Sequence, residues 1–97
     1  MRLVLHRRVR SDVDDIMDFY VRAEHPELAD DFYRELRRFM IAAARHPHRH
    51  HIFTADLRRA NLKRFPYHFL YRVLDDCVRI LVVRHHRRHP DYGLERK

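Results

Sequence analysis

The strongest constraint on the fold is a period-two alternation of residue types over residues 67–86, interrupted only by a short acidic turn. The segments "YHFLYRVL" and "CVRILVVRHH" are rich in β-branched and aromatic residues, a composition typical of β-strands. Asp75-Asp76, between them, suits a two-residue type I′ turn because aspartate tolerates a positive φ. The sequence therefore predicts a β-hairpin over these residues.

A turn at Asp75-Asp76 also predicts the register of the hairpin, and with it two faces of different character. The expected partners are Leu74 with Cys77, Val73 with Val78, Arg72 with Arg79, Tyr71 with Ile80, and Phe69 with Val82. One face is apolar and is expected to pack under helices: Tyr67, Phe69, Tyr71, Val73, Val78, Ile80 and Val82. The other face is mixed and is expected to be open: His68, Leu70, Arg72, Arg79, Leu81, Val83 and His85.

Upstream of the hairpin the apolar residues follow a helical period. In "SDVDDIMDFYVRAEH", Ser11 is a predicted N-cap, and the aspartates behind it suit the positive end of a helix dipole. His25-Pro26 separates this helix from a second one, which we expect to run to about His46, before Pro47. The expected buried positions of the two helices are Val13, Ile16, Met17 and Tyr20, then Leu28 or Ala29, Phe32, Leu36, Phe39, Met40 and Ala43.

Two further strands complete the predicted order of elements. "RLVLHR" at residues 2–7 reads as an opening strand, and "LRRANLKRF" reads as a strand from about Leu57. If Phe65-Pro66 turns the chain back, Ala60 and Leu62 join the apolar face. The resulting β-α-α-β-β-β order predicts an α+β fold, with a helical hairpin packed on one face of a small, mainly antiparallel four-stranded sheet. With 45% apolar residues, one Gly and four Pro, residues 1–97 are expected to form a single domain.

The composition favours a polyanionic partner. Lys and Arg total 21 against 14 Asp and Glu, which gives a net charge of +7, and ten histidines add positive charge as the pH falls. Nucleic acid, an acidic protein and an anionic membrane surface all fit that charge. No apolar run is long enough to span a bilayer, no signal peptide is evident and Cys77 is alone, so we expect a cytoplasmic protein without a membrane segment or intrachain disulfide.

The expected pairing of Arg72 with Arg79 places like charges on neighbouring strands, which is unfavourable unless another group intervenes. A bound anion or an acidic partner would be such a group. The alternative is that both arginines extend into solvent or pair with carboxylates elsewhere in the fold. The predicted anion- or partner-binding residues are Arg59, Arg72, Arg79, His85 and Arg88.

Two carboxy-terminal motifs, "FPYHFLYRVLDD" and "VRILVVRHHRRHPDY", together with the order of elements, resemble the RelE/ParE superfamily of toxins from bacterial type II toxin-antitoxin (plasmid stabilisation-like) modules. The resemblance covers nearly the whole chain. It implies a small basic, growth-inhibiting toxin neutralised by a co-expressed antitoxin, usually through an acidic or amphipathic segment that wraps it. A dimer or a toxin-antitoxin heterotetramer is an assembly compatible with this resemblance. ParE-like members inhibit DNA gyrase, whereas RelE-like members cleave mRNA on the ribosome.

The two branches share one scaffold, so site residues must separate them. The RelE-like reaction, attack of a 2′-hydroxyl on the adjacent phosphate, would use Lys63, His68, Arg87 and Tyr92 of this chain. The match is partial, because His68 stands where an arginine is common and Gly93 stands where many relatives carry tryptophan, which bears on how the tail packs. We therefore favour a ParE-like, non-enzymatic gyrase inhibitor that acts through a basic sheet edge and the carboxy-terminal tail. The alternative is a RelE-like ribosome-dependent mRNA endoribonuclease (mRNA interferase).

Other chemistries find less support in the sequence. The histidines of residues 46–51 and 85–89 match no zinc-ligand spacing and lack cysteine partners, so we expect polar loops and neither metal nor cofactor. There is no glycine-rich phosphate loop. A generic single-stranded nucleic-acid binder is a third hypothesis, but the predicted register turns Tyr67, Phe69 and Tyr71 toward the helices, away from bases.

Overall fold

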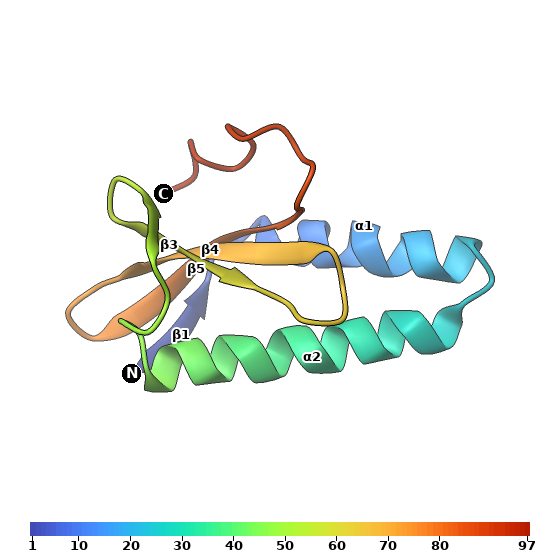
Figure 1. The fold of residues 1–97 in the computed structure, drawn as a ribbon, viewed down its shortest axis with the longest axis horizontal. Helices are drawn as coiled ribbons and strands as arrows, with labels where there is room; N and C mark the ends of the chain where they lie inside the picture. The colour runs from blue at the N-terminus through green and yellow to red at the C-terminus, as the bar shows by residue number, and fades with distance from the viewer.

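The computed structural model describes all residues, 1–97, and arranges two helices against one mixed sheet (Figure 1). The elements are β1 (Arg2–Leu5), α1 (Val9–Arg22), α2 (Pro26–Arg45), β2 (Ile52–Thr54), β3 (Leu57–Asn61), β4 (Tyr67–Val73) and β5 (Cys77–His85). The sheet has five strands in the order β1-β5-β4-β3-β2. β1 is parallel to β5, and the other neighbours are antiparallel.

The α+β class and the helical hairpin on one sheet face are confirmed, but the expected strand number is wrong. The additional strand is β2, three exposed residues that pair with β3. Because all three residues are exposed, they carry no inside-outside alternation by which a strand is recognised. The strand expected from Leu57 is also shorter than "LRRANLKRF", since β3 ends at Asn61.

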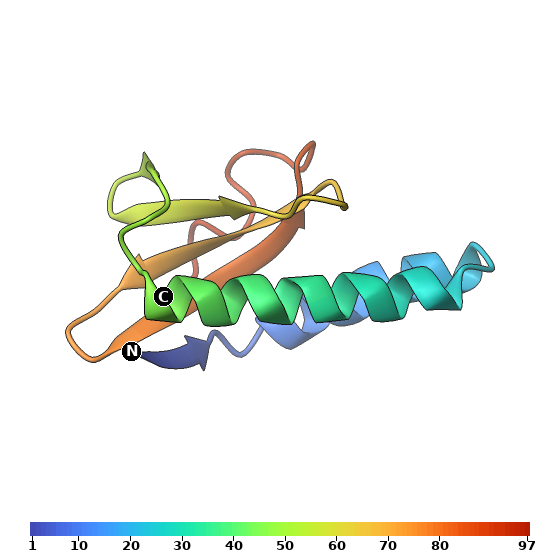
Figure 2. The ribbon, with the colours of Figure 1, turned by 60° about the horizontal axis from the view of Figure 1, so that its bottom comes forward.

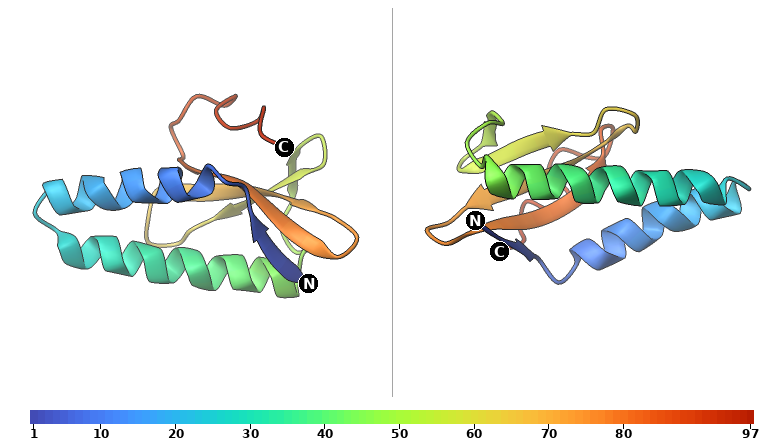
Figure 3. Two further views of the ribbon diagram at one scale, coloured as in Figure 1. Left: turned by 180° about the vertical axis from the view of Figure 1, so that it is seen from behind. Right: turned by 90° about the horizontal axis from the view of Figure 1, so that it is seen from below.

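The helical hairpin forms much as expected, apart from its start. α1 begins at Val9, so the prediction that Ser11 caps it is wrong. Instead the Nδ1 atom of His6 accepts the Arg8 amide at 3.1 Å, and the His6 carbonyl accepts the Val9 amide at 2.9 Å. Pro26 opens α2, where its missing N–H costs no hydrogen bond. Figure 3 shows the two helices lying side by side in opposite directions.

The main core lies between the helices and the sheet. Apolar stripes of α1 and α2 supply one side, and Ala60, Leu62, Phe69, Tyr71 and Ile80 are among the residues on the other side. Four rings pack together at the end near the helix-helix turn, with centroid distances between 5.2 and 6.5 Å: Tyr20, Phe32, Phe65 and Tyr67. Neither helix has the length and apolarity needed to cross a lipid bilayer.

The β4–β5 hairpin has the predicted register near its turn and a different one beyond it. Val73 opposes Val78, Arg72 opposes Arg79 and Tyr71 opposes Ile80, as expected. A bulge then shifts the pairing, so that Phe69 opposes Val83 and not Val82. Val83 consequently joins the helix-facing core cluster, whereas Leu81 and Val82 are buried outside that cluster.

The second face of the sheet is covered, which contradicts the expectation of an open face. Residues 86–97, here called the tail, have neither helix nor strand and run across the sheet on the side away from the helices (Figures 1 and 2). Five side chains of this covered side are at most 4% exposed: His68, Leu70, Leu81, Val82 and Arg84. Buried Gly93, at φ +84°, lies so close to Val82 that a Cβ at this position would come within 2.6 Å of Val82 Cγ2. A bulky residue is thus not needed for the tail to pack at this position.

Candidate functional site

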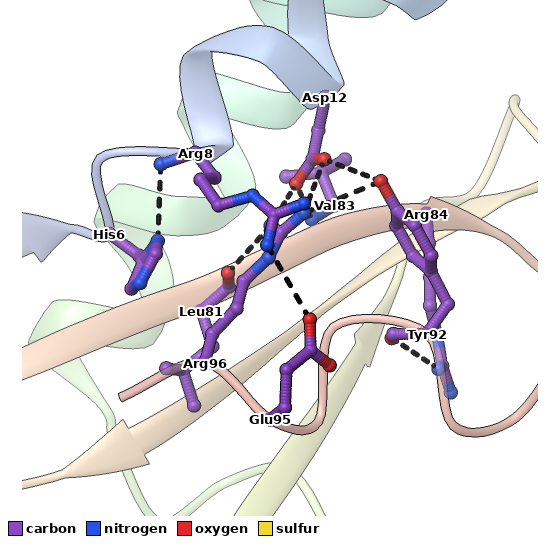
Figure 4. A network of polar contacts seen from close by, with 9 residues as sticks. All are labelled: His6, Arg8, Asp12, Leu81, Val83, Arg84, Tyr92, Glu95 and Arg96. Atoms are coloured by element: carbon purple, nitrogen blue, oxygen red, sulfur yellow. Dashed lines mark hydrogen bonds and ion pairs between the residues drawn. The ribbon is translucent and has the colours of Figure 1, made fainter.

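A buried ion pair fixes the end of the tail to the start of α1 (Figure 4). Arg96 donates from Nη1 to Asp12 Oδ2 at 2.6 Å and from Nη2 to Asp12 Oδ1 at 3.0 Å. The two side chains are only 1% and 3% exposed. Burying two charges is favourable only when their remaining polar atoms are also bonded, so the surroundings of the pair are informative.

The pair also completes the hydrogen bonding of an unpaired strand edge. β1 accompanies β5 only to Ile80, and beyond that point the outer edge of β5 has no neighbouring strand. There the Val83 amide donates to Asp12 Oδ2 at 3.1 Å, and the Leu81 carbonyl accepts from Arg96 Nη1 at 2.9 Å. Asp12 and Arg96 thus replace the missing strand at two backbone groups that would otherwise be buried without partners.

Tyr92 joins this network from the tail. Its hydroxyl donates to Asp12 Oδ1 at 3.3 Å, and the Arg88 guanidinium lies over its ring at 4.0 Å from the centroid. Glu95 approaches Arg8 at 3.6 Å. Two of these contacts therefore fasten the tail to α1 and to the loop before it.

A second cluster lies under the middle of the tail and is centred on Arg84. Its Nη1 atom donates to the carbonyls of Pro90 at 2.7 Å and Tyr92 at 2.9 Å, and its Nε donates to His68 Nε2 at 2.9 Å. Burial lowers the pKa of Arg84 from its ordinary value. An arginine keeps its charge in proteins, so the cluster holds a cation bound by neutral acceptors.

The hydrogen bonds around Arg84 define the protonation of two histidines. Because His68 Nε2 accepts from Arg84, its proton is on Nδ1, which is 3.0 Å from His86 Nδ1. His86 Nδ1 therefore accepts, both from His68 and from Arg59 Nη2 at 3.3 Å. Burial, followed by the charges of Arg59 and Arg84, lowers the pKa of His68 to about 3, and burial beside Arg59 lowers that of His86. Both imidazoles are neutral at physiological pH.

A cavity of about 610 Å³ lies between α1 and the tail. Here it is called the tail cavity. Phe19, Tyr67, His85, Arg88 and Tyr92 are among its lining residues, and Phe19 is 60% exposed. Burial raises the pKa of Tyr67 to about 12, so its hydroxyl keeps its proton. The cavity therefore offers apolar rings beside cationic and imidazole groups, a mixture that suits a protein partner.

The four residues that RNA cleavage would use have different surroundings. Lys63 is exposed in the loop after β3, and so is not on the strand where it was expected. His68 is buried under the tail, Arg87 is exposed on the tail, and the Tyr92 hydroxyl is bonded to Asp12. No hydrogen bond or ion pair joins any two of the four. Arg84 is the one common neighbour of His68 and of the Tyr92 backbone.

The five residues predicted to bind an anion or partner mostly have partners within the chain. Arg72 pairs with Asp56 at 2.7 Å, and this hydrogen bond lowers the pKa of Asp56. Arg79 Nε donates to the Lys97 backbone oxygen at 2.9 Å. Each of the opposed arginines of β4 and β5 thus has an acceptor within the fold, and anion binding by them stays a prediction. Arg59 contacts His86, and His85 and Arg88 border the tail cavity.

Sequence reasoning missed Asp12, Arg84, His86 and Arg96 as members of the site. For Asp12 a signal existed: it precedes Ile16 by one helical turn and follows Val9 by three residues, so it lies on the buried stripe of α1. For Arg84 and Arg96 no periodic pattern was available, because the bulge and the irregular tail decide where they lie. No three His, Cys, Asp or Glu side chains of the chain form a group able to hold a metal ion.

Comparisons with known proteins agree with the geometry of the fold. Residues 3–90 match the family model of the ParE toxin of type II toxin-antitoxin system, parDE. No curated protein sequence matches the chain. A solved structure described as the chromosomal ParDE TA system from P. aeruginosa aligns with a TM-score of 0.77 and 23% identity, over 88% of this chain and 95% of that chain. That likeness supports the fold alone, but the family model spans nearly the whole sequence. The chain therefore belongs to the ParE toxin family of type II toxin-antitoxin systems.

Proposed function

We propose that this ParE-family protein is a non-enzymatic inhibitor of DNA gyrase that a cognate antitoxin neutralises. The choice of gyrase as the target rests on the hydrogen bonding of His68 and Tyr92. In an RNA-cleaving relative these two side chains would be the best able to move protons. Both are bound inside the network that holds the tail. Family membership supports the toxin-antitoxin context.

The chemistry of RNA cleavage explains why this observation matters. A general base must accept the 2′-hydroxyl proton, and a general acid must protonate the leaving oxygen. His68 is 1% exposed, and both of its ring nitrogens have intramolecular partners. A histidine whose pKa is about 3 is also a poor acid-base group near neutral pH. These properties favour a toxin that acts by binding.

We propose the tail cavity and its rim as the gyrase-contacting surface. Phe19 supplies an exposed ring, and His85 and Arg88 supply polar groups beside it. Arg59 contacts His86 of the tail and adds a cation beside it. Exposed aromatic and arginine side chains are enriched at the centres of protein interfaces, which supports this assignment.

A different groove is proposed for the antitoxin. A groove of about 490 Å³, lined mainly by apolar side chains, lies between β1, α1 and α2. Leu5 is 49% exposed there, Tyr33 46% and Ile41 36%, and Arg10 and Arg37 also line the groove. β1 is the edge strand beside it. An amphipathic acidic segment fits this combination of an apolar groove, flanking cations and a free strand edge.

Gyrase inhibition is tested directly with the purified chain. The protein is expected to inhibit DNA supercoiling or to trap cleaved DNA, and to leave mRNA on ribosomes intact. Arg88→Ala is expected to weaken inhibition, because Arg88 lines the tail cavity and covers the Tyr92 ring. Arg22→Ala is the matched control, since it removes an exposed arginine at the far end of α1.

Two outcomes would overturn the proposal. The first is full supercoiling activity in the presence of excess toxin. The second is codon-positioned cleavage of mRNA on ribosomes that is lost in His68→Ala, Arg87→Ala or Tyr92→Phe, which would assign the protein to the ribonuclease branch. Growth of cells that express the chain alone, compared with cells that also express the neighbouring open reading frame, tests the antitoxin half of the proposal.

A further inference from the structure

A second polar cavity lies at the other end of the buried Asp12–Arg96 pair, beside the loop that joins β1 to α1. Its volume is about 460 Å³, and it is lined by His6–Arg8, Arg79 and Glu95–Lys97, without one apolar residue. Here it is called the loop cavity. Five of its seven lining residues are permanent cations and one is a carboxylate, so the cavity has a strong positive potential. None of the proposed gyrase- or antitoxin-contacting residues lines it.

Arg96 supplies a buried donor that has no acceptor within the chain. Its side chain is 1% exposed. Nη1 donates to Asp12 and to the Leu81 carbonyl, and Nη2 donates to Asp12 and to the Tyr92 hydroxyl. Its Nε is buried and has no hydrogen-bond partner. Burying an N–H of a charged group without an acceptor costs free energy, because its hydrogen bond to water is lost and is not replaced. Arg96 is also one of the residues that line the loop cavity, although its Nε atom is itself buried.

The start of α1 borders the loop cavity. Arg8 is the N-cap of α1 and lines the cavity. Of the first amides of the helix, those of Arg10 and Ser11 have no hydrogen bond to the chain, whereas that of Val9 is bonded to His6. Arg10 and Ser11 do not line the loop cavity, but the positive end of the helix dipole beside the cavity favours an anion.

The arginines of the loop cavity are close enough to act on one group together. His6 demonstrates this, because its pKa is lowered first by burial and then by the charges of Arg96, Arg79, Arg7 and Arg8. Glu95 is the one acidic side chain among the lining residues, and its distance to Arg8 is 3.6 Å, while the Lys97 backbone oxygen accepts one bond from Arg79. The distance from Glu95 to Arg8 is longer than a charge-assisted hydrogen bond, so the ion pair does not saturate Arg8.

We propose that the loop cavity binds a phosphate group. Several guanidinium forks around one space match the oxygens of a phosphate better than those of a single carboxylate, and a dianion balances more of the charge. The absence of apolar lining argues against an amphipathic peptide. The group comes either from a free phosphate compound or from a nucleic-acid backbone. The proposal does not depend on gyrase as the target of the toxin.

Binding is tested with inorganic phosphate, titrated into the 97-residue chain in a phosphate-free buffer of low ionic strength. Calorimetry measures the affinity, and NMR follows the pKa of His6, which a bound anion is expected to raise. Arg7→Ala is the test variant, because Arg7 is exposed and has no hydrogen-bond or ion-pair partner in the chain. It is expected to weaken binding by about tenfold or more, the usual effect of losing one charge-assisted contact. Arg22→Ala removes an exposed, equally unpartnered arginine in the last turn of α1 and serves as the control.

The comparison of the two variants decides the proposal. Loss of affinity in Arg7→Ala but not in Arg22→Ala, with a rise in the His6 pKa in the unaltered chain, supports it. Absence of phosphate binding, equal loss in both variants or an unchanged His6 pKa overturns it. A short DNA duplex distinguishes the sources: binding that phosphate competes away and Arg7→Ala weakens indicates a backbone phosphate, and binding of phosphate alone indicates a free compound. Arg7→Ala is expected to inhibit gyrase as the unaltered chain does, because Arg7 lies outside the tail cavity. A gyrase assay of this variant therefore tests the proposed function separately from phosphate binding.

Discussion

At the scale of single residues, Asp12 has the largest number of structural roles. It accepts from Arg96, from Tyr92 and from the amide of Val83, and so it connects α1, the tail and the edge of β5. Removing the carboxylate would leave the Arg96 cation buried without its counter-ion. Uncompensated buried charge is among the few single-residue defects that are strongly destabilising.

We expect Asp12→Ala to lower the free energy of unfolding by about 3–5 kcal/mol. Urea unfolding measures this, and Asp14→Ala is the control, because Asp14 pairs with Arg10 at 3.9 Å on the exposed side of α1 and should lose little. Asp12→Ala/Arg96→Ala, which removes both charges, should recover part of the loss. If Asp12→Ala and Asp14→Ala have equal stability, the buried pair does not stabilise the fold as described.

His68 gives the protein a predictable dependence on acid. The folded chain keeps His68 neutral until the pH nears 3, whereas the unfolded chain protonates it near 6.5. Below 6.5 the unfolded state therefore binds more protons, and stability falls as the pH decreases, by at most about 1.4 kcal/mol per pH unit for this group. His6, His50 and His86, whose pKa values are also lowered, act in the same direction.

We expect stability measured by urea unfolding to decrease between pH 7 and pH 5, a range above most carboxylate titrations. His68→Gln should show a smaller decrease over that range, because glutamine does not titrate while its amide can still bond to Arg84. His48→Gln is the control, since His48 is exposed in the loop before β2. Identical slopes for the original chain and His68→Gln would contradict the assigned protonation of His68.

At the scale of elements, the tail functions as a third layer although it has no regular secondary structure. Arg84 holds its middle by two short bonds to carbonyls, and Arg96 holds its end. Between these points Gly93 lies against Val82 with no room for a side chain, in a left-handed conformation that suits glycine. The tail therefore depends on polar bonds and one close backbone approach, more than on apolar burial.

Gly93→Ala is expected to destabilise the tail, because the added methyl would overlap Val82 and φ +84° is unfavourable for alanine. Overpacking and such a backbone conformation each cost on the order of 1–3 kcal/mol. Hydrogen exchange of the tail amides should accelerate more than that of α2. The double variant Gly93→Ala/Val82→Ala should recover the stability lost through overlap with Val82. The stability lost through the unfavourable backbone conformation of the introduced alanine should remain lost. Unchanged hydrogen exchange of the tail amides in Gly93→Ala would show that the packing of the tail does not depend on the close contact of Gly93 with Val82.

The elements also show how far the sequence predicts this fold. Helical and strand periods identify α1, α2, β4 and β5, because each buries one stripe or one face in the main core. The two-residue period does not predict the positions of Leu81 and Val82. A strand that is covered on both faces has a continuous run of apolar residues, and a bulge within such a run does not change the sequence pattern. The periodic patterns also fail for the tail. The partners of Arg84 and Arg96 there are backbone carbonyls and a single aspartate, whose positions depend on the complete fold.

At the scale of the whole molecule, α1 separates the two proposed partner surfaces. Ile16 and Phe19 of α1 line the tail cavity, whereas Val13 and Met17 line the apolar groove that it shares with α2. At about 100° of rotation per residue, Ile16 and Phe19 lie on one flank of the buried stripe of α1, and Val13 and Met17 lie on its other flank. The toxic contact and the neutralising contact are therefore expected to be separable by mutation.

Phe19→Glu and Ile41→Glu test this separation in cells. Phe19 is 60% exposed in the tail cavity and Ile41 36% exposed in the groove, so a glutamate at either site remains solvated and should leave the fold intact, which thermal unfolding checks. Phe19→Glu should reduce growth inhibition but still bind the protein encoded by the neighbouring open reading frame. Ile41→Glu should inhibit growth and escape rescue by that protein, because a carboxylate in the groove repels an acidic segment and removes apolar contact. If one variant loses both properties while it remains folded, a single shared surface serves both partners and the separation by α1 is refuted.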